Sequence, residues 1–179
     1  TVCSELELKG VLLFESKIFK DSRGSFSEVY NSDYSNYIPQ EVRFIQDNES
    51  VSKYGVLRGL HFQKRPFEQS KLVRVSKGEI QDIVVDIRRD SPTFGKYISV
   101  LLSKENGRQV FVPKGFAHGF LALSKEAIVN YKVDNKYSKE HESGIMYSDK
   151  DLLINWKIEP EKLIISDKDL LLPFLKDLK

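Results

Sequence analysis

Cysteine is almost absent from this chain of 179 residues, since Cys3 is the only one. A disulfide within the chain and a cluster of thiolate metal ligands are therefore both excluded. So little cysteine fits a reducing compartment, and we expect a cytoplasmic protein. Histidine is also scarce, and no two of His61, His118 and His141 have the spacing of metal ligands along one strand. The residues alone thus give only a weak indication of a metal site.

Long apolar runs and blocks of like charge are missing as well. No apolar run reaches the roughly 18 residues that a membrane-spanning helix needs, and the start "TVCSELELKGVLLF" lacks the layout of a signal peptide. The 28 basic and 26 acidic residues are interspersed along the chain, whereas a nucleic-acid-binding surface concentrates Lys and Arg on one face. We therefore expect neither a membrane nor a nucleic acid as a partner, although a few arginines in a cleft can hold a small anion.

Familiar catalytic motifs are absent too. The sequence has no Gly-x-Ser-x-Gly elbow, no glycine-rich phosphate loop before a helix and no dinucleotide fingerprint. The motifs that are familiar from nucleophilic catalysis and nucleotide binding therefore give no indication of function here.

Short runs of β-branched and aromatic residues, separated by turns that contain glycine, are what the sequence does have. This spacing predicts an all-β protein, and the lack of a long amphipathic helix disfavours a parallel sheet. We expect one domain over 1–179, with a jelly-roll core at about 10–135 and a C-terminal cap of short helices at about 145–179. The predicted strands are the runs 11–19, 42–46, 56–62, 71–76, 80–88, 96–103, 108–113, 118–124 and 127–133.

The stretch "GVLRGLHFQ" (55–63) places polar residues inside an apolar strand. Strict alternation puts His61 and Gln63 on one face and Arg58 on the other. Gly59 has no side chain, so room for a ligand is left beside the imidazole of His61. Two interpretations stay open on these residues: a strand that lines a pocket, or a core histidine beside a glycine kink.

Other polar residues also allow two interpretations each. Gln46 and Asn48 in "FIQDNESVS" can form a hydrogen-bonding floor for a sugar or phosphate, or cap a loop. His118 lies between glycines in "PKGFAHGF", which fits a binding residue or a half-buried histidine at a tight bend. Tyr131 in "VNYKV" is a proton donor if its hydroxyl reaches a pocket, although most strand tyrosines only pack. Asp169 in "SDKD" fits a helix-capping box, the interpretation that local sequence favours.

Taken together, the polar segments resemble the dTDP-4-dehydrorhamnose 3,5-epimerase family in order and nearly from end to end. The resemblance implies a cupin-like jelly roll, a homodimer, no metal and no cofactor. It also implies a nucleotide-diphospho-4-keto sugar as the partner, inverted at C3 and/or C5 for surface polysaccharide precursor synthesis. The matching segments are "DSRGSFSE" (21–28), "FIQDNESVS" (44–52), "GVLRGLHFQ" (55–63), "KLVRVSKGEIQDIVVDIRRDSPTFG" (71–95), "VPKGFAHGFLALS" (112–124) and "NYK" (130–132).

The resemblance implies a role for each matched residue. His61 is the base that takes a proton next to the C4 ketone, and Tyr131 is the acid on the opposite face. Lys71 stabilises the charge that develops on the C4 oxygen, and Asp169 orients His61. The residues implied in substrate binding are Arg23, Glu28, Gln46, Asn48, Arg58, His118, Glu142 and Lys168, of which Arg23 and Glu28 reach into the partner's pocket.

One departure from the family pattern concerns the nucleotide base. The family usually reads Tyr-Lys-x-Thr-Asn-Tyr-Tyr where this chain has "YKVDNKY", so Lys136 replaces the tyrosine that commonly stacks on thymine. Such a stacking contact is typically worth about 1 kcal/mol. Phe26 can still stack on the base. A GDP-linked 4-keto heptose is therefore the leading alternative to a dTDP-linked 4-keto-6-deoxyglucose.

Two other classes of function remain open at this point. The first is a non-catalytic cupin that binds nucleotide sugars, which the joint presence of His61, Lys71, Tyr131 and Asp169 disfavours, because binding alone needs no acid and base. The second is a metal-dependent cupin oxygenase, which stoichiometric iron in the purified protein would reveal.

Overall fold

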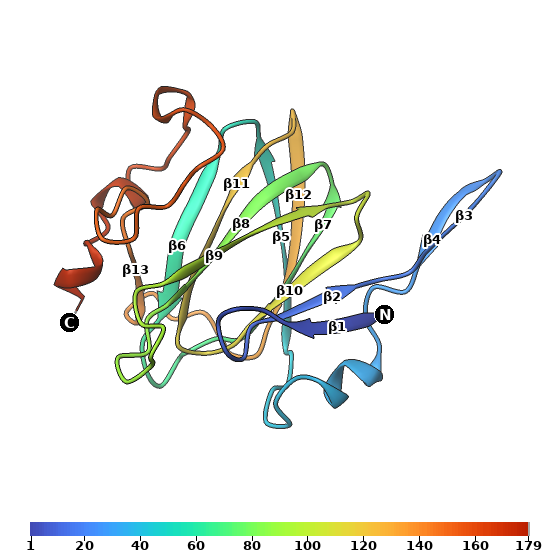
Figure 1. Cartoon of the computed structure of the whole chain (residues 1–179), viewed down its shortest axis with the longest axis horizontal. Coiled ribbons are helices and arrows are strands. Elements are labelled where there is room, and N and C mark those ends of the chain that lie inside the picture. The colour runs from blue at the N-terminus through green and yellow to red at the C-terminus, as the bar shows by residue number, and fades with distance from the viewer. Residues whose placement is uncertain (179) are drawn as a thin grey trace.

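Two antiparallel sheets lie face to face in the computed structural model, which describes residues 1–178 (Figure 1). The six-stranded sheet has the order β1 (Val2–Glu5), β2 (Leu12–Glu15), β10 (Arg108–Val112), β7 (Lys71–Lys77), β12 (Glu126–Val133) and β5 (Gln46–Lys53). The five-stranded sheet has the order β13 (Glu142–Gly144), β6 (Leu57–Gln63), β11 (Phe116–Ala122), β8 (Glu79–Asp86) and β9 (Tyr97–Ser103). The predicted all-β jelly-roll class is confirmed.

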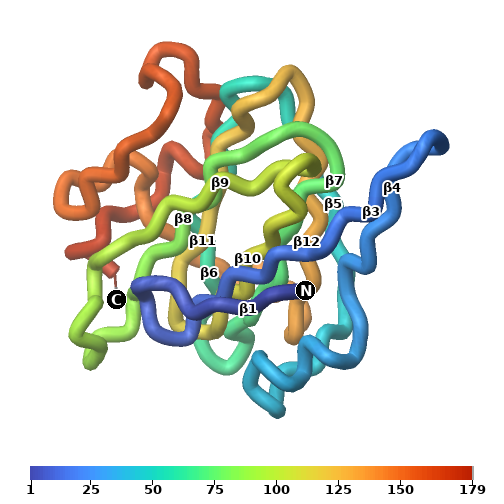
Figure 2. Tube along the Cα trace, turned by 45° about the vertical axis from the view of Figure 1, so that its right-hand side comes forward, coloured from blue at the N-terminus to red at the C-terminus, as the bar shows by residue number. Residues whose placement is uncertain are grey.

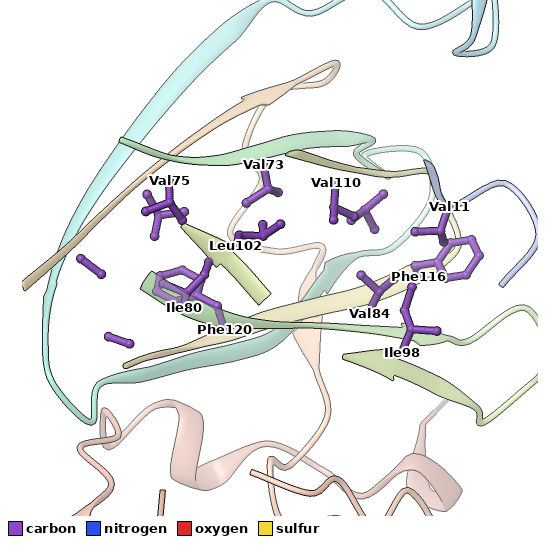
Figure 3. Close-up of a cluster of buried hydrophobic side chains, with 14 of the residues drawn as sticks. Val11, Val73, Val75, Ile80, Val84, Ile98, Leu102, Val110, Phe116 and Phe120 are labelled. Atoms are coloured by element: carbon purple, nitrogen blue, oxygen red, sulfur yellow. The ribbon is translucent and has the colours of Figure 1, made fainter. Parts of the chain in front are cut away.

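The core fills the space between the two sheets (Figure 3). Side chains alternate across each strand, so Val73 and Val110 of one sheet meet Val84 and Phe120 of the other. The strand β8, which lies between β11 and β9, is buried on both faces, because its alternate residues such as Ile83 pack outward beneath the C-terminal segment. That explains the nearly continuous apolar run of "IVV" at its centre.

The C-terminal segment covers the outer face of the five-stranded sheet, beside β6 and β13 (Figure 1). Its helical parts are short 3₁₀ turns: η2 (Pro160–Lys162), η3 (Asp169–Leu171) and η4 (Leu175–Asp177). Pro173 follows η3 and prevents that turn from continuing as a helix, whereas Pro160 lies at the start of η2, where proline is tolerated. Leu152, Ile158 and Leu175 anchor this segment to the sheet. Among residues 1–178, no helix is long and apolar enough to cross a membrane.

A hairpin of β3 (Ile18–Asp21) and β4 (Gly24–Ser27) projects away from the sandwich in both views (Figure 1, Figure 2). We call residues 18–28 the arm. The run 11–19 predicts a single strand, but the chain leaves the sheet after Glu15, so the run is divided between β2 and the arm. The aromatic side chains of Phe19 and Phe26 are 52% and 69% exposed on this arm.

The prediction of a strand at 42–46 is wrong. The strand β5 begins only at Gln46 and consists of the polar sequence "QDNESVSK". Val42 is buried and Phe44 half-buried, but they pack against Phe14 and Tyr34 on the outer face of the six-stranded sheet, near η1 (Ser32–Asn36). Burial in a connecting segment produces the same apolar pattern as a strand does. The polar strand β5 instead lies at the open edge of its sheet.

A β-bulge in β6 corrects the strict alternation expected there. On β11 the residues paired with His61 and Arg58 are His118 and Phe120, which are two positions apart, whereas His61 and Arg58 are three apart. The strand β6 therefore contains one extra residue, and the direction of its side chains changes phase at this point. As a result Arg58 and His61 both line one cavity instead of facing opposite sides.

Two glycines make this bulge possible. Gly59 has φ +123°, and a Cβ atom placed on it would lie 2.6 Å from the Cα of Gly119 on β11. A Cβ on Gly119 would in turn lie 2.6 Å from the carbonyl oxygen of Arg58. The backbones of β6 and β11 thus approach so closely that neither position has room for a side chain.

We predict that Gly119→Ala lowers the free energy of unfolding by about 1 to 3 kcal/mol, because the added methyl group forces β6 and β11 apart. Gly119 has no positive φ, so the loss is steric. Urea denaturation followed by tryptophan fluorescence measures it. An unchanged midpoint would mean that the two strands separate at no cost.

Candidate active site

A cavity of about 500 Å³ opens between the two sheets. Polar side chains from both sheets and from the C-terminal segment line it, namely Arg58, His61, Lys71, His118, Tyr131 and Asp169. An adjoining cavity of about 240 Å³ shares His61, Lys71 and Tyr131 and is also lined by Gln46, Asn48, Tyr137 and Glu142. Most of the residues predicted for the site thus come together in one place.

His61 and Asp169 form a hydrogen-bonded pair at the wall of this cavity. Nε2 of His61 lies 2.6 Å from Oδ1 of Asp169, and the backbone N–H of Gly59 donates to Oδ2 at 3.1 Å. The side chain of His61 remains 31% exposed, whereas that of Asp169 is 7% exposed. A buried carboxylate that orients a partly open imidazole is the arrangement of a histidine base.

The capping interpretation of Asp169 holds only for its backbone. The N–H of Asp169 donates to Oγ of Ser166 at 3.2 Å, as a cap requires, but the carboxylate turns to His61 and Gly59. Burial opposes ionisation of this carboxylate, yet the hydrogen bonds from His61 and Gly59 outweigh it and lower the pKa of Asp169 below its ordinary value. At neutral pH the group is therefore an anion that stabilises a protonated His61.

Tyr131 and Lys71 reach the cavity from the opposite sheet. Burial raises the pKa of Tyr131 above its ordinary value, while the nearby charge of Arg58 acts in the other direction, so the phenol keeps its proton at neutral pH. Burial also lowers the pKa of Lys71 to about 8, although the carboxylates of Asp82 and Glu142 oppose that change. The cavity thus combines a base on one wall with a phenol and a weakly solvated ammonium on the other.

Arg58 and two amides provide further polar contacts. Nε of Arg58 donates to Oγ of Ser52 at 3.0 Å, which holds the guanidinium at the cavity wall. On β5, the side-chain amide of Gln46 donates to Oδ1 of Asn48 at 2.7 Å. Asn48 lies opposite Tyr131 in the register of β5 and β12. The amides are therefore part of a strand floor and not of a loop cap.

A short polar network connects the two cavities, because Tyr137 and Glu142 line the smaller one and Lys168 lines the larger one; we call this place the mouth. The hydroxyl of Tyr137 donates to Oε2 of Glu142 at 2.7 Å, and Nζ of Lys168 donates to the same oxygen at 2.6 Å. Burial opposes ionisation of Glu142, but these two donors lower its pKa, and the same contact raises the pKa of Lys168. Tyr137, which the sequence interpretation passed over, supplies the aromatic side chain at this mouth, while Lys136 lines neither cavity.

A second histidine–carboxylate pair lies deeper in the sandwich. Nε2 of His118 is 2.8 Å from Oδ2 of Asp82, and the two side chains are 8% and 0% exposed. The sequence interpretation missed Asp82. Its signal was an aspartate that shares the inward face of β8 with Ile80 and Val84, where a charge is rarely found without a partner.

Three predicted binding residues lie outside these cavities. Arg23, Phe26 and Glu28 belong to the arm, and the guanidinium of Arg23 is paired with Asp21 at 2.7 Å in open solvent. Within one chain they do not reach His61. Among residues 1–178, no group of three or more His, Cys, Asp or Glu side chains is arranged to hold a metal ion.

Comparisons with known proteins identify the family of this chain. A family model for dTDP-4-dehydrorhamnose 3,5-epimerase matches residues 5–177. The epimerase of that name from Shigella flexneri is 50% identical over 165 residues, which cover 92% of this chain and 90% of the relative. The one from Methanothermobacter thermautotrophicus is 52% identical over 163 residues, which cover 90% of this chain and 88% of the relative.

A solved structure gives the same answer in three dimensions. The dTDP-6-deoxy-D-glucose-3,5-epimerase from Legionella pneumophila, in complex with dTDP-4-keto-L-rhamnose, superimposes with a TM-score of 0.95. It is 42% identical, and the match covers 99% of this chain and 94% of that one. The chain described here therefore belongs to the dTDP-4-dehydrorhamnose 3,5-epimerase family.

Proposed function

We propose that this protein is an epimerase that inverts C3 and/or C5 of a dTDP-linked 4-keto-6-deoxy sugar, in the synthesis of surface polysaccharide precursors. The observation that carries the proposal is the position of His61 and Tyr131. They belong to different sheets and line the same cavity. Inversion at carbon needs a base on one side of the sugar ring and an acid on the other, whereas binding alone needs neither.

The proton moves in two steps. The imidazole of His61 takes the proton from the carbon next to the C4 ketone, which leaves an enolate and an imidazolium. Asp169 stabilises that imidazolium through its 2.6 Å contact. The phenol of Tyr131 then donates its proton to the opposite face of the same carbon, and solvent restores both groups. Because one proton leaves and another enters, the product carries a hydrogen from solvent.

Lys71 is the group that stabilises the enolate. The negative charge of the enolate develops on the C4 oxygen and needs a positioned cation or donor. Lys71 lines both cavities, and a buried ammonium interacts with an anion more strongly than one in water does. Its pKa of about 8 leaves it mostly protonated at neutral pH.

The remaining site residues bind the nucleotide and the sugar. The fork of Arg58 suits the diphosphate, while Gln46, Asn48 and His118 present polar groups to the sugar. The mouth with Tyr137, Glu142 and Lys168 receives the base, and Tyr137 offers the aromatic surface that Lys136 lacks. These assignments support thymine as the base, in line with the names of the relatives.

The working unit is a homodimer of this single domain, located in the cytoplasm. The arm is the support for this part of the proposal, because it projects from the sandwich with exposed aromatic side chains (Figure 1). Arg23, Phe26 and Glu28 then complete the pocket of the partner, with Phe26 stacking on the base. The exposed edge strand β5 is a suitable place for the arm to dock.

The proton path predicts how solvent deuterium enters the sugar. In heavy water, wild-type protein should exchange hydrogen at C3 or C5 of the 4-keto sugar, as NMR or mass spectrometry detects. His61→Asn should lose exchange at both positions by about 10²-fold or more, because general base catalysis is removed. Tyr131→Phe should slow inversion more than exchange, because the first proton still leaves.

Matched substitutions control for this experiment. His141→Asn and Tyr97→Phe alter the same residue types outside both cavities and should keep wild-type exchange. Exchange at the wild-type rate in His61→Asn would refute its role as the base, and equal losses of exchange and inversion in Tyr131→Phe would make this residue a positioning group only.

The base assignment predicts a preference among nucleotides. By calorimetry, dTDP should bind at least about tenfold more tightly than GDP, a difference of about 1.4 kcal/mol. Tyr137→Ala should weaken dTDP binding by about 1 kcal/mol through loss of stacking, whereas Lys136→Ala, one position away, should change it little. Tighter binding of GDP would instead favour the heptose substrate.

The dimer predicts complementation between two defective variants. His61→Asn damages the cavity, and the double variant Arg23→Ala/Glu28→Ala damages the arm. If each arm serves the partner's cavity, half of the dimers in an equal mixture are mixed and have one intact site, so about a quarter of wild-type activity should appear. Activity equal to the mean of the two separate variants would show that each arm serves its own chain.

A further inference from the structure

The buried carboxylate of Asp82 takes no part in the proton path described above. The carboxylate of Asp82 is 0% exposed, and only one of its oxygens has a partner, His118. The other oxygen, Oδ1, is buried and without a hydrogen bond within residues 1–178. A buried carboxylate with an unpaired oxygen is costly unless a cation lies near it.

Lys71 is the cation in the same interior. Asp82 points inward from β8, between Ile80 and Val84, and Lys71 points inward from β7 of the facing sheet. The negative charges of Asp82 and Glu142 attract the ammonium of Lys71 electrostatically and so favour its protonated form. The other titratable or charged groups that line this cavity are His118 on β11, His61 and Arg58 on β6, Tyr131 on β12, and Lys168 and Asp169 of the C-terminal segment.

We propose that Asp82 is a positioning residue for the epimerase reaction: its buried carboxylate keeps Lys71 charged and fixes the ring of His118. This inference rests on the proposed function, since it concerns the group that meets the C4 oxygen. Asp82 is not among the residues that line either cavity, and its hydrogen bond connects it to the lining residue His118. It acts through its two neighbours.

The electrostatics give the direction of the effect. Burial alone lowers the pKa of Lys71, and the attraction of Asp82 and Glu142 limits that fall, so that the pKa stays at about 8. Loss of the Asp82 charge would therefore lower the pKa of Lys71 further, toward neutral pH. A neutral amine stabilises an enolate poorly, so turnover would fail at a lower pH than in the wild type.

The contact with His118 adds a second effect. Its Nε2 is held by Asp82. Within residues 1–178 its other ring nitrogen, Nδ1, has no hydrogen-bond partner, and His118 lines the cavity. The carboxylate of Asp82 accepts a hydrogen bond from Nε2–H, so in the neutral ring Nδ1 is the unprotonated nitrogen. Asp82 thereby determines which nitrogen the sugar meets.

The pH dependence of kcat tests the proposal. In Asp82→Asn the alkaline limb of the profile should move to lower pH by roughly half to one unit, because one of the two carboxylates that support the charge of Lys71 is gone. Asp82→Glu keeps the charge, so the alkaline limb should stay in place. Its kcat should still fall, because the longer side chain no longer fixes the ring of His118. An unmoved limb in Asp82→Asn, or a moved limb in Asp82→Glu, overturns the proposal.

Asp149→Asn is the matched control. Asp149 is also a buried carboxylate, 3% exposed, but it caps the C-terminal segment by accepting from the N–H of Leu152 and Leu175. Its loss should lower the melting temperature and leave the limb unmoved. If Asp82→Asn does not fold, Asp82→Ser removes the same charge with a smaller polar side chain, and an unmoved limb in that variant overturns the proposal.

A titration without substrate separates this proposal from the proposed function. In protein with ¹⁵N-labelled lysine, the Nζ signal of Lys71, identified by its loss in Lys71→Arg, should titrate near pH 8 and shift to lower pH in Asp82→Asn. Failure of the wild type to epimerise any 4-keto sugar would refute the function but not this link. An identical Lys71 titration in both proteins would refute the link alone.

Discussion

The carboxylate of Asp169 is the contact on which the candidate site depends. One oxygen holds the ring of His61 and the other accepts from the N–H of Gly59, at the bulge of β6. One buried group therefore ties the C-terminal segment to a strand that lies 108 positions earlier in the chain. The bulge gives His61 its direction, and the carboxylate satisfies the backbone that the bulge leaves unpaired. The geometry of the base thus needs the last part of the chain as much as the strand that carries it.

The period of the apolar residues predicted the fold well, because in a sandwich nearly every strand has one face in the core. The prediction from the apolar period failed where buried residues are not in a strand and where a paired strand is not buried. The run 42–46 is apolar because it covers the outer face of a sheet, and the polar strand β5 is paired although it has few apolar residues. The apolar period of β6 also cannot predict its bulge, since the bulge depends on how many residues of the partner strand β11 lie opposite.

The site was predictable in part, and the reasons differ between residues. His61 was conspicuous as a polar residue in an apolar strand, but local sequence favoured a capping role for Asp169, whose true partner is distant. Asp82 escaped notice because its strand showed ordinary alternation, and the fact that both faces of β8 are buried emerges only when the C-terminal segment is placed. Tyr137 was not predicted because the family pattern places the stacking tyrosine one position earlier, where this chain has Lys136.

Three carboxylates and three cations lie in or next to the two cavities, and each carboxylate has different contacts. The cations are Arg58, Lys71 and Lys168. Asp169 holds the ring of His61, Glu142 joins Tyr137 to Lys168, and Asp82 holds the ring of His118. Burial affects Lys71 in two opposing ways, because it strengthens the attraction to an enolate and also favours loss of the proton. With a pKa of about 8 the amine is poorly solvated and still mostly charged at neutral pH. A more solvated lysine would attract an anion less strongly, and one without nearby carboxylates would lose its proton more readily.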